Sequence, residues 1–100
     1  RGESLGRTWD AMLAAGVAPN AVAFSTTLAA LARSKKPGKS ATALLGRVLD
    51  SLQPRHINGY VIIAGASAIM GLVASGDGQQ QLRMLDALVA PALKGTQVEL

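Results

Sequence analysis

Apolar residues in this chain recur every three or four positions, and glycine, proline and asparagine interrupt the recurrence at short intervals. A period of 3.6 residues places apolar side chains on one face of an α-helix, whereas a strand alternates apolar and polar residues. Alanine at 18 positions and leucine at 14 also favour helix. The pattern therefore predicts several short amphipathic helices and no sheet.

The interruptions divide the chain into five expected helices. These helices cover residues 4–15, 21–34, 40–52, 58–74 and 79–90, and a frayed tail begins at residue 94. Gly16 is expected to end the first helix, Asn20 and Ser40 to cap the second and third, and Pro91 to limit the fifth. Trp9 is expected to pack in the core. Because the connections are short, consecutive helices should pair as antiparallel hairpins.

Two aromatic residues indicate an internal repeat. Phe24 and Tyr60 lie 36 residues apart, each opens a helix, and a leucine-rich amphipathic helix follows each. Such units stack side by side because one hairpin alone cannot bury its apolar face. We therefore expect an all-α fold, in which antiparallel helical hairpins stack as a short α-solenoid of about two and a half repeats. Phe24 and Tyr60 should occupy like points of successive hairpins. The single domain, 1–100, comprises a partial unit 1–20, units 21–56 and 57–93, and a tail 94–100.

The residue composition argues against catalysis. The chain has no cysteine, its single histidine is His56, and its six acidic residues are scattered. The absence of cysteine excludes disulfides, thiolate metal sites and cysteine nucleophiles. One histidine cannot form a cluster for a metal or a proton relay. We expect no enzymatic activity, no catalytic residue, no metal and no cofactor.

Positive charge is concentrated in the middle of the chain. The net charge is +4, and residues 33–55 contain six basic side chains against one acid, Asp50. A local positive field attracts phosphates, either of nucleic acid or of lipid headgroups. Three interpretations stay open: a solvated surface, contact with nucleic acid, and contact with a membrane or an acidic partner.

A stretch near the N-terminus matches a known repeat pattern. From Met12 to Leu28 the sequence reads MLAAGVAPNAVAFSTTL. It has a methionine, then a turn of glycine, a hydrophobic residue, proline and asparagine, and then an aromatic residue that opens the next helix. This pattern resembles the pentatricopeptide repeat family, and the resemblance extends from Trp9 to about Leu52.

The resemblance implies a module that binds single-stranded RNA in a mitochondrion or chloroplast, with about one base read by each repeat. In that family one base-facing side chain lies just after the aromatic residue of the first helix, and another lies at the junction before the next unit. On this chain the corresponding candidates are Asn20, Ser25, Arg55 or His56, and Val61. Asn20 can instead be only a helix cap, and Ser25 only a polar residue of the first turn. Phosphate contacts are expected from Arg33, Lys35, Lys36, Lys39 and Arg47.

Two other functions stay open at this point. The apolar end faces of a short array need a partner, which favours a structural or scaffold subunit of an organellar protein complex without RNA binding. Residues 59–75 contain no charge, and their length is close to the lower limit for a membrane-spanning helix. That helix would make the chain a small subunit of a membrane complex. Because the chain begins at Arg1, we expect a processed or partial chain in which a targeting peptide is not visible.

Overall fold

The computed structural model describes residues 2–34, 39–73 and 76–97. These ranges form five α-helices and one 3₁₀ turn, and they contain no strand. The expected all-α fold is therefore confirmed. The elements are α1 (Gly2–Ala14), α2 (Ala21–Ala32), α3 (Lys39–Asp50), η1 (Pro54–His56), α4 (Gly59–Leu72) and α5 (Gly78–Gln97).

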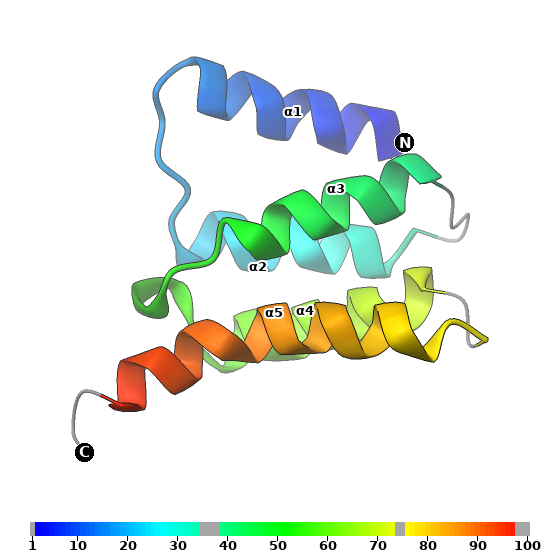
Figure 1. The fold of residues 1–100 in the computed structure, drawn as a ribbon. Coiled ribbons are helices and arrows are strands. Elements are labelled where there is room, and N and C mark those ends of the chain that lie inside the picture. The colour runs from blue at the N-terminus through cyan, green and yellow to red at the C-terminus, as the bar shows by residue number, and fades with distance from the viewer. Residues whose placement is uncertain (1, 35–38, 74–75, 98–100) are drawn as a thin grey trace.

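The helices form stacked antiparallel hairpins in two layers, and consecutive helices run in opposite directions (Figure 1). α3 contacts α1 on one side and α5 on the other, so these three helices make one layer. α2 lies along α4 in the second layer. The α2–α3 hairpin therefore packs against the α4–α5 hairpin, and α1 covers the other side of α3.

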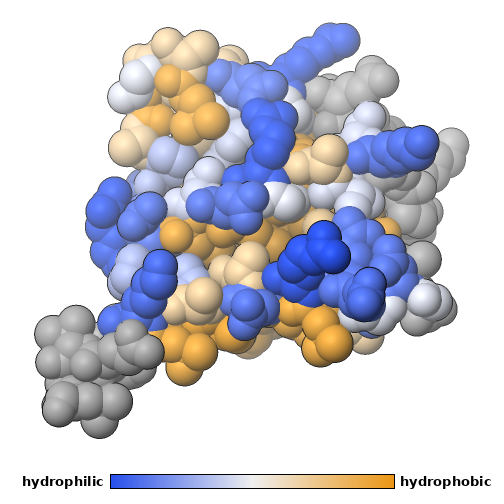
Figure 2. Space-filling view, viewed as in Figure 1, coloured by the Kyte–Doolittle hydropathy of each residue, from blue (hydrophilic) through white to orange (hydrophobic). Residues whose placement is uncertain are grey.

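The core lies between the two layers and is formed mainly by the apolar faces of α2, α3 and α4. Phe24, Leu28 and Leu31 of α2 are fully buried, and α3 buries one apolar face. Trp9 is also in the core, with 2% of its surface exposed. On the face shown in Figure 2, hydrophilic residues cover much of the surface, and hydrophobic residues are visible along the edge at α5. The buried apolar residues are Trp9, Phe24, Leu28, Leu31, Ala41, Leu44, Leu45, Val48, Leu49, Leu52, Val61, Ala68, Ile69, Leu72, Val73, Met84 and Leu88.

The ends of the first two helices follow the sequence signals. Gly16 has a φ of 79°, a left-handed conformation that glycine adopts without steric cost. The Ala23 N–H donates to Asn20 Oδ1 at 2.8 Å, so Asn20 caps α2 as predicted. The Val61 N–H donates to Asn58 Oδ1 at 2.9 Å, which gives α4 the same type of cap.

Most helix ends lie within two residues of their predicted positions, and three features differ from the predictions in another way. α3 begins at Lys39, so Ser40 lies inside the helix and is not its cap. α5 continues through Pro91 to Gln97, where a limit at the proline and a frayed tail were expected. Proline removes one main-chain hydrogen bond, and the burial of the Pro91 ring offsets that cost. The third difference is η1, where a loop was expected.

Phe24 and Tyr60 occupy different environments, so their expected equivalence is wrong. Phe24 is fully buried, whereas 79% of Tyr60 is exposed. α2 and α4 both begin after an asparagine cap, Asn20 and Asn58, but Phe24 follows its cap by four positions and Tyr60 by two. Because each residue turns a helix by about 100°, two positions move a side chain to nearly the opposite face. Val61, 37 residues after Phe24, is buried instead.

The apolar helix expected over residues 58–74 is α4, which covers Gly59–Leu72. Residues 74 and 75 lie outside the described part of the chain. Among the described helices, none is both long enough and apolar enough to cross a membrane.

Candidate functional site

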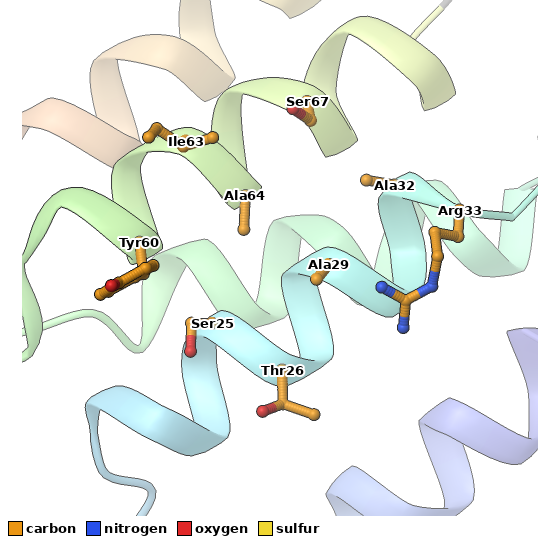
Figure 3. Close-up of a pocket in the computed structure, with 9 residues that line it drawn as sticks. All are labelled: Ser25, Thr26, Ala29, Ala32, Arg33, Tyr60, Ile63, Ala64 and Ser67. Atoms are coloured by element: carbon orange, nitrogen blue, oxygen red, sulfur yellow. The ribbon is translucent and has the colours of Figure 1, made fainter.

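α2 and α4 border an open groove with a volume of about 560 Å³ (Figure 3). Four lining residues come from α2, four from α4, and Arg33 follows the end of α2. The lining residues are Ser25, Thr26, Ala29, Ala32, Arg33, Tyr60, Ile63, Ala64 and Ser67.

Small side chains produce this groove. α2 lies close along α4, and a Cβ atom added at Gly71 would be 3.7 Å from the Ala32 carbonyl oxygen. The lining alanines Ala29, Ala32 and Ala64 are too short to fill the surface above this contact. The larger side chains of Tyr60 and Arg33 lie at opposite ends of the groove (Figure 3).

The groove presents one positive charge and several hydroxyl groups. Arg33 provides the charge, and Ser25, Thr26, Ser67 and Tyr60 provide the hydroxyls. Among the described residues that line the groove, none is acidic. Ser25 Oγ donates to the Val22 carbonyl at 3.1 Å, so its oxygen can still accept a hydrogen bond. This combination suits an anionic ligand with polar edges.

The structure separates the predicted base-facing residues. Ser25 lies in the groove. Asn20 is exposed at the start of α2, where its side-chain oxygen accepts the capping hydrogen bond. Arg55 is exposed in η1 and does not line the groove.

Val61 and His56 are not base-facing, which corrects two predictions. Val61 has no exposed surface and packs in the core. Only 5% of His56 is exposed. Its ring packs on Phe24 with the ring centroids 4.5 Å apart. Neither side chain can reach a base without unfolding part of the core.

His56 connects the turn before α2 to the turn before α4. Its Nδ1 accepts a hydrogen bond from the Gln53 N–H at 3.0 Å. Nδ1 can accept only while the ring is neutral. Burial lowers the pKa of His56, the adjacent Arg55 charge lowers it further, and a hydrogen bond to the Pro19 backbone opposes both effects.

We expect the free energy of unfolding to decrease as the pH falls through about 6.5, the pKa of histidine in an unfolded chain. The folded pKa is lower, so between the two values the unfolded state binds more protons and is favoured by acid. Urea unfolding followed by circular dichroism between about pH 8 and pH 5 measures this change. His56→Phe keeps an aromatic ring on Phe24 and should remove the dependence in this range. An equal pH dependence in that variant would contradict the assignment.

The predicted phosphate contacts have different surroundings. Arg33 lies in the groove, and Lys39 is exposed at the start of α3. Lys35 and Lys36 lie outside the described residues. Arg47 Nη2 donates to Asp10 Oδ1, which links α3 to α1 and neutralises this charge. Of the described candidates, Arg33 and Lys39 are therefore the better placed to contact phosphate.

Tyr60 is one of the groove residues that the sequence interpretation missed. Its spacing from Phe24 suggested a like position, but the buried residue is Val61, which follows Tyr60 by one position.

Among the described residues, no group of three histidine, aspartate or glutamate side chains could hold a metal ion. No protein-family model, curated protein or solved structure matches this chain.

Proposed function

We propose that this chain is a non-catalytic helical repeat module of the pentatricopeptide type that binds single-stranded RNA in a mitochondrion or chloroplast. The organelle and the repeat type follow from the resemblance between Met12 and Leu28. One observation supports RNA binding above the others. Ser25, which follows the motif's aromatic residue, lines the same groove as Arg33 and Tyr60, and no described lining residue is acidic.

The charge of the chain supports the same proposal. Arg33 and Lys39 border the connection between α2 and α3, which belongs to the basic segment 33–55. Positive side chains bind the phosphates of any RNA sequence and release counterions, so affinity should fall steeply with salt. Backbone contacts of this kind position a strand and add affinity without base selection.

Removing the charges of Arg33 and Lys39 is expected to weaken RNA binding. For Arg33→Ala with Lys39→Ala, we expect lower affinity for every single-stranded sequence, and a slope of log affinity against log salt that is less steep by about 1.4. Fluorescence anisotropy with a labelled oligoribonucleotide at several salt concentrations measures both quantities. The matched control is Arg7→Ala with Arg83→Ala, since these exposed arginines lie on α1 and α5, away from the groove.

Two results would contradict the proposal. In the first, the chain with its native residues shows no RNA binding even at low salt. In the second, the control pair loses as much affinity as the Arg33 and Lys39 pair. The second result would mean that net charge, and not this groove, determines binding.

A scaffold subunit without RNA binding is the second candidate, and exposed apolar side chains favour it. Leu82, Val89 and Leu93 are exposed at helical spacing on α5, and Met70 and Ile63 are exposed on α4. Figure 2 shows apolar side chains along this edge. Light scattering that detects self-association, together with no RNA binding at low salt, would favour the scaffold over the RNA-binding module.

A further inference from the structure

We infer that Tyr60 is the residue on which an unpaired base of the bound strand stacks. This inference rests on the proposed RNA binding and names the contact that would recognise a base. The chain has one tryptophan, one tyrosine and one phenylalanine. Trp9 and Phe24 are buried, whereas Tyr60 is 79% exposed and lines the groove. Tyr60 is therefore the aromatic residue whose ring a base can reach.

The backbone holds Tyr60 at a fixed place. It lies in the first turn of α4, between the Asn58 cap and Val61, whose N–H donates to the Asn58 side chain. Val61 is fully buried and fixes the adjacent backbone to the core. A tyrosine on such a rigid position has only two side-chain torsions to order, so binding costs little conformational entropy.

The space around Tyr60 is open enough for a base. The preceding residue is Gly59, and a Cβ atom added there would meet no atom within 4 Å. The groove floor beside the tyrosine consists of the short side chains of Ser25, Ala29 and Ala64. A planar base can therefore approach the ring without displacing a large side chain.

Arg33 provides the matching contact for the RNA backbone. It stands at the other end of the groove from Tyr60 and Ser25 (Figure 3). Ser25 and Arg33 are eight residues apart, which is about 12 Å along a helix. A single strand that lies along the groove can therefore place a base on Tyr60 and a phosphate at Arg33. Stacking is sequence-tolerant because every base has a π-face, and it requires a single strand whose bases are free.

Abasic RNA distinguishes the contribution of base stacking to affinity from the contribution of charge. The probe is a labelled single-stranded oligoribonucleotide, compared with an oligonucleotide of the same length that lacks its bases. Tyr60→Ala is expected to lower affinity for the base-containing strand by about tenfold. It should leave affinity for the abasic strand unchanged. Tyr60→Phe keeps the ring and should bind like the native chain.

Met70→Ala is the matched control, because Met70 is a large exposed side chain of the same helix, has no ring and does not line the groove. Its affinity should change by less than about twofold. Circular dichroism should be the same for all variants, since both altered residues are exposed. If the native chain binds RNA and Tyr60→Ala binds equally well, or loses equal affinity for the abasic strand, stacking on Tyr60 is wrong while the proposed function stands. If the native chain binds neither strand at low salt, both proposals fail.

Discussion

Phe24→Ala is expected to lower the free energy of unfolding by about 3–5 kcal/mol. Phe24 is fully buried. Its ring meets Trp9 edge-on, with the centroids 5.4 Å apart, and it also packs against His56. Alanine would remove both ring contacts and leave a cavity between α1, α2 and η1. Because a domain of this size is stable by only about 5–15 kcal/mol, such a loss would leave much of the chain unfolded or close to it.

Tyr60→Ala is the matched comparison, and its expected effect on stability is below about 0.5 kcal/mol, as for exposed positions in general. The two residues lie 36 positions apart and both open a helix, but only Phe24 is buried. Urea unfolding of both variants, followed by the helical circular dichroism signal, gives the two free energies directly. Similar losses for the two variants would mean that α4 is rotated relative to its described position.

The helices themselves could be predicted because their signals are local. Apolar residues at helical spacing predicted the helix whose buried face contains Leu44, Val48 and Leu49, and Asn20 predicted the start of α2. Capping and periodicity depend on residues only a few positions apart. The antiparallel hairpins then follow from the short connections.

The site could be predicted only in part, because its geometry depends on contacts between distant residues. Ser25, a candidate base-facing residue, lines the groove, but His56, another candidate, is buried. Its burial requires the Phe24 ring, which is 32 residues earlier in the chain. Arg47 likewise looked available, and its partner Asp10 comes from α1. A single sequence contains no local signal for either pairing.

Gly65 shows the same dependence on a distant residue. It lies buried in the middle of α4, where glycine costs about 1 kcal/mol relative to alanine. A Cβ atom at this position would be 2.7 Å from Cδ1 and 3.0 Å from Cδ2 of Leu88 on α5. Leu88 itself is almost fully buried. The glycine therefore provides the space into which the leucine packs and sets how closely α4 approaches α5.

Gly65→Val is expected to lower the free energy of unfolding by about 1–3 kcal/mol, because the added methyl groups overlap the Leu88 side chain. Leu88→Ala alone should cost about 2–5 kcal/mol through the cavity it leaves. In the double variant the valine occupies that cavity, so the combined loss should be smaller than the sum by about 0.5–3 kcal/mol.

The control for this pair is Gly46→Ala on α3, where the nearest atom to an added Cβ is Met84 Cε at 3.9 Å. That distance is an ordinary contact, so the gain in helix propensity should raise stability by up to about 1 kcal/mol. Urea unfolding of Gly65→Val, Leu88→Ala, the double variant and Gly46→Ala gives the free energy of unfolding of each. Strictly additive losses for Gly65→Val and Leu88→Ala would show that the two residues do not touch. In that case the described packing of the second hairpin, which also orients Tyr60 toward the groove, would be wrong.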